Sequence, residues 1–172
     1  NLQDTHFVEQ IARMADEAGI SLKRIIMELT ETAVMTDPED ALRVMKELNG
    51  QGVRLSIDDF GTGYSSLSYL KQLPVDEIKI DRSFVMEMVK NNDDQMIVNT
   101  TLTMGHNLSM EVVAEGIEDA ITLQKLKEMG CDLAQGYHIA RPMPAADFFT
   151  WLSKYRASLH SDTIAVDKRK QG

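Results

Sequence analysis

The sequence predicts an α/β fold in which helices cover a parallel β-sheet. Short segments rich in Ile, Val and Leu alternate with longer segments whose apolar residues recur every three to four positions. This alternation is typical of parallel sheets, because the crossover that joins two parallel strands usually contains a helix. No Pro-, Gly- or Ser-rich linker divides the 172 residues, so we expect one domain.

Two helices and two strands are expected in the first third of the chain. Asp4 can cap a helix that ends before Gly19, and residues 25–29 have the apolar character of a buried strand. Asp37 begins a second helix, because a proline and two acidic residues follow it and favour a first helical turn. Residues 53–57 alternate apolar with polar side chains, which predicts the second strand.

The alternation continues to residue 155. It predicts strands over residues 77–81, 111–114 and 133–137, and helices over residues 92–108, 118–129 and 145–155. Residues 161–172 are polar and have no apolar period, so we expect a flexible tail after a domain that spans residues 1–160. About five strands fit either an open doubly wound sheet or part of a (β/α)8 barrel, which typically needs about 250 residues.

The composition argues against several classes of function. The 27 acidic residues outnumber the 18 Lys and Arg residues and give a formal net charge of −9, which disfavours binding to a nucleic-acid polymer. The single cysteine, Cys131, rules out an intrachain disulfide, and no apolar run reaches the roughly 20 residues of a membrane-spanning helix. The chain begins with Asn1 rather than Met, and we expect it to be a piece of a longer polypeptide.

Ionisable or amide side chains occur at the ends of all five predicted strands. They are Glu28 and Glu31, Asp58 and Asp59, Lys79 and Asp81, Glu115 and Glu118, and Gln135. Any one of them could be a solvated charge, but the carboxyl ends of parallel strands meet at one edge, where α/β enzymes place their chemistry. Hard divalent cations prefer such converging carboxylate oxygens, and two cations can stabilise the attacking and leaving oxygens of a phosphoryl displacement.

Asp58 and Asp59 are the most informative pair. Successive side chains of a strand point to opposite faces, so we expect adjacent aspartates to converge only where the strand breaks into a loop. The glycines of the following segment, residues 60–67, permit such a break, although a plain Asx-type turn is the alternative. This segment lacks the lysine of a P-loop, and we expect it to be a mobile loop beside a metal site.

Lys79 lies between Glu77 and Asp81 on one face of its predicted strand. That face is either exposed on an edge strand or interior, and an interior lysine needs a carboxylate or water partner. In the interior, Lys79 could orient or activate a metal-bound water. Other chemistry is not indicated, because the four histidines have no metal-ligand spacing and Ser65 and Ser66 lack a nucleophile-elbow pattern.

Five stretches together resemble the EAL-domain family of bacterial cyclic di-GMP phosphodiesterases. They are Glu28-Leu29-Thr30-Glu31, the run from Asp58-Asp59-Phe60-Gly61 to Ser66-Leu67, Lys79-Ile80-Asp81-Arg82, Ala114-Glu115-Gly116-Ile117-Glu118, and Gln135-Gly136-Tyr137 with Arg141-Pro142-Met143-Pro144. They follow the family order with similar separations and cover nearly the whole chain. The resemblance implies a TIM-barrel-like (β/α)8 fold in which one strand is reversed.

The resemblance also implies a role for each matching residue. The metal ligands would be Glu28, Asp58, Asp59 and Glu115, with Glu115 alternatively a general base. Lys79 would contact the hydrolytic water, Gln135 would hold the polar network of the site, and Glu31 would anchor the glycine loop. The residues near the nucleotide would be Asp81, Glu118, Pro142 and Met143. The implied reaction is hydrolysis of cyclic di-GMP to linear pGpG, with Mg²⁺ or Mn²⁺ in a two-metal site. In this family the glycine loop couples dimerisation to metal binding, so a homodimer is expected. A cytoplasmic domain is implied, and a membrane-tethered parent with an upstream sensory or GGDEF domain is compatible with it.

The chain departs from the family in one respect. The name-giving Glu-Ala-Leu strand and the next strand, which carries a metal-binding asparagine, do not occur in it. We therefore expect a barrel without its first two strands, with the C-terminal residues of an active member intact. Two other functions stay open, a catalytically inactive cyclic di-GMP receptor and an interaction module that has kept only the fold. Turnover would identify the enzyme, binding without turnover the receptor, and absence of binding the interaction module.

Overall fold

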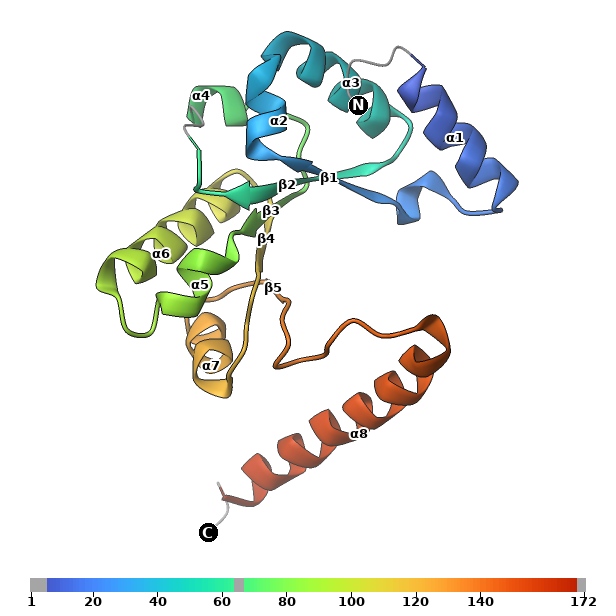
Figure 1. The fold of residues 1–172 in the computed structure, drawn as a ribbon. Coiled ribbons are helices and arrows are strands. Elements are labelled where there is room, and N and C mark those ends of the chain that lie inside the picture. Colours follow the sequence, from blue (N-terminus) through green and yellow to red (C-terminus); the bar gives the residue numbers. More distant parts are fainter. Residues whose placement is uncertain (1–5, 64–66, 170–172) are drawn as a thin grey trace. The chain divides into compact units, whose positions relative to one another are not determined.

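Figure 1 shows the computed structural model of the chain, which describes the backbone of residues 6–63 and 67–169 and the side chains up to residue 157. The chain divides into two compact units, Asn1–Ile139 and Ala140–Gly172, and each is described by itself. The helix cap expected at Asp4 and the serines Ser65 and Ser66 lie outside the described residues.

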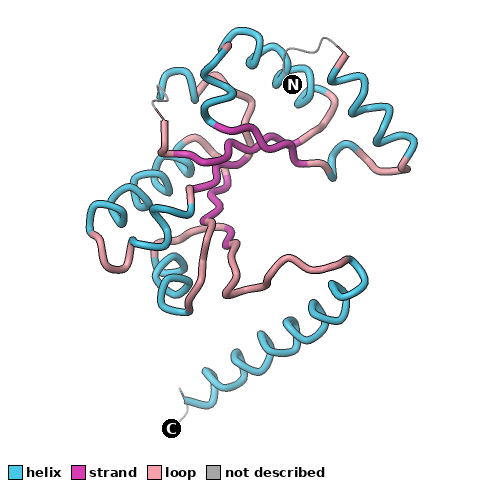
Figure 2. Tube along the Cα trace, viewed as in Figure 1, coloured by secondary structure: helices cyan, strands magenta, loops and turns pink. Residues whose placement is uncertain are grey.

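The first unit is built on a parallel sheet of five strands. They are β1 (Ile26–Thr30), β2 (Arg54–Phe60), β3 (Glu77–Ile80), β4 (Glu111–Ala114) and β5 (Leu133–Ala134), and they lie side by side in that order (Figure 2). A doubly wound sheet reverses its strand order at a switch point. The sequential order over the described strands is instead that of consecutive βα units in a barrel, so the doubly wound alternative is wrong.

Helices connect the strands and follow the predicted alternation. They are α1 (Phe7–Glu17), the 3₁₀ helix η1 (Leu22–Arg24), α2 (Glu31–Thr36), α3 (Pro38–Gly50), α4 (Leu67–Leu70), α5 (Arg82–Glu87), α6 (Asn92–Asn107) and α7 (Ala120–Glu128). The cap predicted at Asp37 is confirmed, since its carboxylate accepts a hydrogen bond from the Asp40 N–H at 3.3 Å. Asp119 caps α7 in the same way, so this helix begins at Ala120 rather than at Glu118. The last strand is two residues long, shorter than the predicted 133–137.

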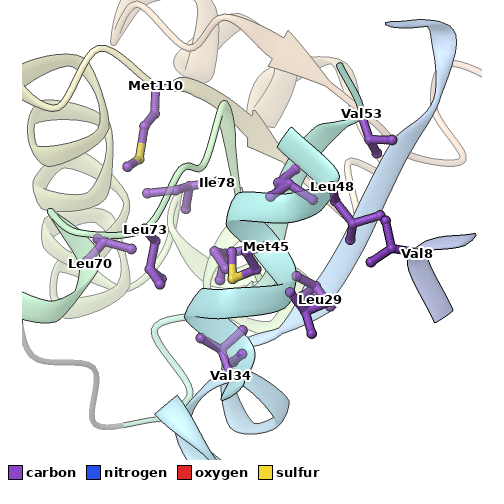
Figure 3. Packing of buried hydrophobic residues seen from close by; sticks show 14 residues of the cluster. Val8, Leu29, Val34, Met45, Leu48, Val53, Leu70, Leu73, Ile78 and Met110 are labelled. Atoms are coloured by element: carbon purple, nitrogen blue, oxygen red, sulfur yellow. The ribbon is translucent and has the colours of Figure 1, made fainter. Parts of the chain in front are cut away.

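One face of the sheet is apolar and packs against the helices. In the first core cluster, Met45 and Leu48 of α3 pack with Leu29, Leu55, Ile57 and Ile78 of three strands (Figure 3). In the second cluster, Ile80, Val112 and Ala114 pack with Val85 of α5, Val98 of α6 and Leu126 of α7. Strand alternation places Ser56, Asp58, Glu77 and Lys79 on the opposite face, which is the interior face of a barrel.

Asp132, just before β5, links α6 to β4. Its carboxylate accepts the Val112 N–H at 2.9 Å and lies 2.9 Å from His106 Nε2. Burial by itself raises the pKa of Asp132, but these two hydrogen bonds outweigh burial and hold the pKa below its ordinary value. The ionised carboxylate therefore stabilises the position of β4.

The second unit contains α8 (Ala145–Arg169), which continues past the end predicted at residue 155. No Gly or Pro occurs between Ala145 and Arg169 to end the helix earlier. Trp151 stacks on Tyr155 with ring centroids 5.1 Å apart. The flexibility expected for residues 161–172 stays a prediction. Among the described helices, none combines the length and the hydropathy that a membrane crossing requires.

Candidate functional site

A β-bulge in β2 brings Asp58 and Asp59 to the same end of the sheet. The register of β2 with β3 shifts between Ile57 and Phe60, so β2 uses one residue more than β3 over this interval. Asp59 has a φ of 55°, a left-handed conformation that aspartate adopts more readily than most residues. The expectation that the strand breaks into a loop is therefore wrong, because the bulge changes the side-chain alternation within the strand.

The ammonium group of Lys79 is surrounded by three carboxylates. Its Nζ lies 2.7 Å from Glu115 Oε1, 2.9 Å from Glu28 Oε2 and 3.1 Å from Asp58 Oδ1. The Lys79 side chain is 6% exposed, and β3 is a central strand, so the exposed-edge alternative is wrong. Asp58 Oδ1 also accepts the N–H of the next residue, Asp59, at 3.1 Å, which is not the bond to the second following residue that defines an Asx turn.

The surroundings of Lys79 keep it charged. Burial by itself lowers the pKa of Lys79, because it disfavours the ammonium ion. The hydrogen bonds to Glu115, Glu28 and Asp58 outweigh burial and raise the pKa above its ordinary value. The group is therefore a permanent cation at physiological pH.

Asp59 and Asp81 form a hydrogen-bonded pair of carboxyl groups next to Asp58. Burial raises the pKa of Asp59, and the negative charges of Asp58 and Asp81 raise it further. Burial also opposes ionisation of Asp81, but hydrogen bonds from Ser83 and Asp59 lower its pKa below the ordinary value. Of the two carboxyl groups, Asp59 is therefore the harder to ionise and Asp81 the easier.

Glu31 holds the beginning of the glycine loop. Its side chain is almost completely buried, and Oε2 accepts the N–H groups of Gly61 and Gly63, both at 3.2 Å. A Cβ atom at position 63 would lie 2.9 Å from Glu31 Oε1, so any other residue there would require the Glu31 carboxylate to shift. Glu31 is the first residue of α2, capped by Thr30, and strand alternation therefore does not determine its direction.

The remaining predicted residues are Glu115, Gln135 and Glu118 in the first unit and Pro142 and Met143 in the second. Glu115 follows β4, and the Gln135 backbone is fixed beside it, with its N–H donating to Ala114 O at 2.9 Å. The Gln135 side chain and Glu118 are exposed, and no described contact joins them to the Lys79 cluster. Pro142 and Met143 belong to the second unit and precede α8. The structure thus brings Glu28, Asp58, Lys79 and Glu115 into one cluster.

Sequence analysis missed a buried polar pair on the same interior face. Ser56 Oγ donates to Glu77 Oε1 at 2.8 Å, and the two residues are 0% and 6% exposed. Each lies two residues before a member of the cluster, Asp58 on β2 and Lys79 on β3. The two-residue period placed Glu77 on the same face as Lys79, but its partner Ser56 depends on the register between two strands.

The carboxylate oxygens at this edge of the sheet are suitable ligands for a hard divalent cation. Glu28, Asp58, Asp59 and Glu115 offer only carboxylate oxygens, the ligands that Mg²⁺ and Mn²⁺ prefer. Within the described parts of the chain, no three His, Cys, Asp or Glu side chains form a ready metal cluster, and Glu28, Asp58 and Glu115 each contact Lys79.

The fold and the site define a barrel-type α/β protein with carboxylates and a lysine at the carboxyl ends of its strands. The sequence model of the EAL domain matches residues 1–142. The chain belongs to the EAL domain family, and the predicted EAL-type barrel fold is confirmed.

Two similar curated proteins come from Pseudomonas aeruginosa. The cyclic di-GMP phosphodiesterase NbdA is 40% identical over 156 residues, which are 91% of this chain and 20% of NbdA. The bifunctional diguanylate cyclase/cyclic di-GMP phosphodiesterase MucR is 46% identical over 146 residues, which are 84% of this chain and 21% of MucR. The chain therefore spans about a fifth of these relatives.

Solved structures show the same fold. The MucR phosphodiesterase in complex with c-di-GMP superposes with a TM-score of 0.83 at 38% identity, over 86% of this chain and 60% of that chain. Klebsiella pneumoniae BlrP1, solved with manganese and cyclic di-GMP, superposes with a TM-score of 0.76 at 34% identity, over 81% of this chain and 36% of that chain.

Proposed function

We propose that this chain provides part of a metal-dependent phosphodiesterase domain that hydrolyses cyclic di-GMP to linear pGpG. The observation that carries the proposal is the buried ammonium of Lys79 among Glu28, Asp58 and Glu115 at the carboxyl ends of the strands. In such a cluster the carboxylates can bind a cation, and the ammonium can donate hydrogen bonds to a phosphate oxygen on which negative charge develops. The names of NbdA and MucR, and the cyclic di-GMP bound in the MucR and BlrP1 structures, support this substrate.

Glu28, Asp58 and Asp59 would hold Mg²⁺ or Mn²⁺, and Glu115 would complete the ligand set or act as general base. A divalent cation bound there would polarise a phosphodiester oxygen and lower the pKa of a bound water. Lys79 donates hydrogen bonds to the phosphate oxygen on which charge develops. As the general base, Glu115 accepts a proton from the attacking water while the water oxygen forms the new P–O bond. The P–O bond to the leaving ribose oxygen breaks, and that oxygen takes up a proton from solvent to become a hydroxyl. Calcium, which prefers looser coordination, should bind and inhibit.

The remaining residues position the substrate and the loop. Glu31 fixes the glycine loop through Gly61 and Gly63, and this loop would connect the metal site to a homodimer interface. Asp81, Glu118, Pro142 and Met143 would contact the nucleotide, and Gln135 would complete the polar network. A cytoplasmic location and an upstream sensory or GGDEF domain belong to the same proposal.

The test is turnover by the longer polypeptide that we expect to contain this chain. Cyclic di-GMP is incubated with Mg²⁺, Mn²⁺, Ca²⁺ or excess chelator, and pGpG is quantified by liquid chromatography. We expect pGpG with Mg²⁺ or Mn²⁺ only, and loss of turnover in the Asp58→Asn variant. Full activity in chelator would refute the metal dependence. Nucleotide binding without pGpG would identify a receptor instead, and absence of binding would identify an interaction module.

A further inference from the structure

The three carboxylates that the proposed function assigns to the metal site already bind a cation of the protein itself. Lys79 Nζ lies within 3.1 Å of one oxygen from each of Glu28, Asp58 and Glu115. A metal ion on the same oxygens would lie within a few ångströms of this ammonium. At about 4 Å, repulsion between a divalent cation and a unit charge weakens binding by roughly a factor of 30 even with the dielectric constant of bulk water, and by more at the lower effective dielectric of a protein surface.

The ammonium and the metal therefore cannot share these oxygens in the present arrangement. Lys79 is nearly buried on a central strand, so its backbone is fixed and only its side chain can move away. Glu77, the neighbouring carboxylate on its own face of β3, is already hydrogen-bonded to the Ser56 hydroxyl at 2.8 Å. An ammonium displaced from the three carboxylates has three N–H groups that it can donate to an anionic ligand bound at this edge of the sheet.

We infer that Lys79 is an internal competitor of the divalent cation: metal binding displaces the ammonium from Glu28, Asp58 and Glu115 and makes its hydrogen bonds available to the substrate phosphate. This inference rests on the proposed function, because it takes the same carboxylates as metal ligands. It assigns Lys79 a second role, that of neutralising the carboxylates whenever no metal is bound. It also explains why these carboxylates contact an ammonium rather than one another.

Two consequences separate competition from a purely catalytic role of Lys79. Loss of the ammonium should strengthen metal binding, whereas a residue that acts only on the reacting phosphate would leave metal binding unchanged. Loss of the ammonium should also leave three uncompensated carboxylates, so that the protein is less stable without metal and gains more stability from metal than the parent does. Neither consequence involves the nucleotide.

The experiment measures Mn²⁺ binding to the 172-residue chain by the electron paramagnetic resonance of free Mn²⁺, without nucleotide. The variants are Lys79→Met, which removes the charge at nearly equal volume, and Lys79→Arg, which keeps it. Lys90→Met is the matched control, since Lys90 is an exposed lysine between α5 and α6. We expect Lys79→Met to bind Mn²⁺ about tenfold or more tightly than the parent, and Lys79→Arg and Lys90→Met to bind within about twofold of it.

Thermal unfolding with and without Mn²⁺ covers the case in which Lys79→Met folds poorly. We expect its melting temperature to rise more with Mn²⁺ than that of the parent or of Lys90→Met. Equal or weaker Mn²⁺ binding by Lys79→Met, an equal rise in melting temperature, or no Mn²⁺ binding by any variant would overturn the inference. Tighter binding without hydrolysis of cyclic di-GMP by the longer polypeptide would instead overturn only the proposed function.

Discussion

Replacement of Glu31 tests the link between the start of α2 and the glycine loop. Its buried carboxylate accepts two backbone N–H groups, those of Gly61 and Gly63, both at 3.2 Å. A hydrogen bond to a charged group is typically worth about 1.5–3 kcal/mol, and we take the lower value for each because these bonds are long. Glu31→Ala should therefore reduce the free energy of opening this loop by about 3 kcal/mol, a factor of roughly 10².

Amide hydrogen exchange at the two glycines measures this loss directly. In Glu31→Ala, Gly61 and Gly63 should exchange about 10²-fold faster than in the parent, because exchange reports local opening. Glu31→Gln should be intermediate, since its amide oxygen accepts a hydrogen bond without a charge. Glu39→Ala, which removes an exposed carboxylate from α3, is the control and should leave both amides unchanged.

The same variant tests the proposed connection between the loop and the metal site. If Glu31 orders the loop beside Asp59, Glu31→Ala should weaken Mn²⁺ binding and dimer formation, measured by titration and by analytical ultracentrifugation. Unchanged glycine exchange in Glu31→Ala would refute the assignment of the carboxylate to the loop. Faster exchange with an unchanged dimer and unchanged metal titration would keep the contact and refute the coupling.

Four further predictions follow from the site and the packing. In the longer polypeptide, Lys79→Ala should lower turnover roughly 10²–10³-fold while nucleotide binding persists, whereas Asp58→Asn should lower metal binding and turnover together. Near-normal turnover of Lys79→Ala would show that Lys79 takes no part in the catalytic step. Gly136→Ala should lower the free energy of unfolding in urea by about 3 kcal/mol, because a Cβ there would lie 2.1 Å from a backbone oxygen. Gly50→Ala, with open space around it, should change the free energy of unfolding little, and equal stabilities of the two variants would contradict this packing. Asp132→Asn should lower the melting temperature at pH 7 but not at strongly acidic pH. A carboxylate with a lowered pKa stabilises the fold above its unfolded-state pKa and loses that effect as the pH falls through its folded-state pKa. An equal drop in melting temperature at both pH values would contradict this prediction. The 172-residue chain alone should hydrolyse cyclic di-GMP far more slowly than the longer polypeptide, and equal rates would show that five strands suffice for the site.

The elements with a clear period were predictable from the sequence. The helix α3 carries both a cap at Asp37 and an apolar face, and β2 alternates apolar with polar side chains, so both were predicted within a few residues of their bounds. The members of the Lys79 cluster were also predictable, since polar residues at the ends of parallel strands meet at one edge. Local sequence therefore identified which side chains could meet.

The way in which those side chains meet was not predictable. The bulge at Asp58 and Asp59 depends on the register between β2 and β3, which the buried side chains of two distant segments determine. The short helices α2, α4 and α5 contain four to six residues, too few for a helical period to be recognised. Because Glu31 lies at the start of α2, strand alternation could not predict its contact with the loop, which was expected from the family resemblance.

The exposure of Glu28 affects how strongly the competition between Lys79 and a metal should appear in this chain. Glu28 is 49% exposed, whereas Asp58 and Glu115 are 23% and 17% exposed, because β1 is an edge strand of the described sheet. Water at this edge screens the ion pair of Glu28 with Lys79, and salt screens it further. A barrel with all eight strands would cover β1 and lower the local dielectric, which strengthens attraction to the carboxylates and repulsion between the two cations alike. The difference in Mn²⁺ affinity between the parent and Lys79→Met should therefore be smallest in the 172-residue chain and larger in the complete barrel.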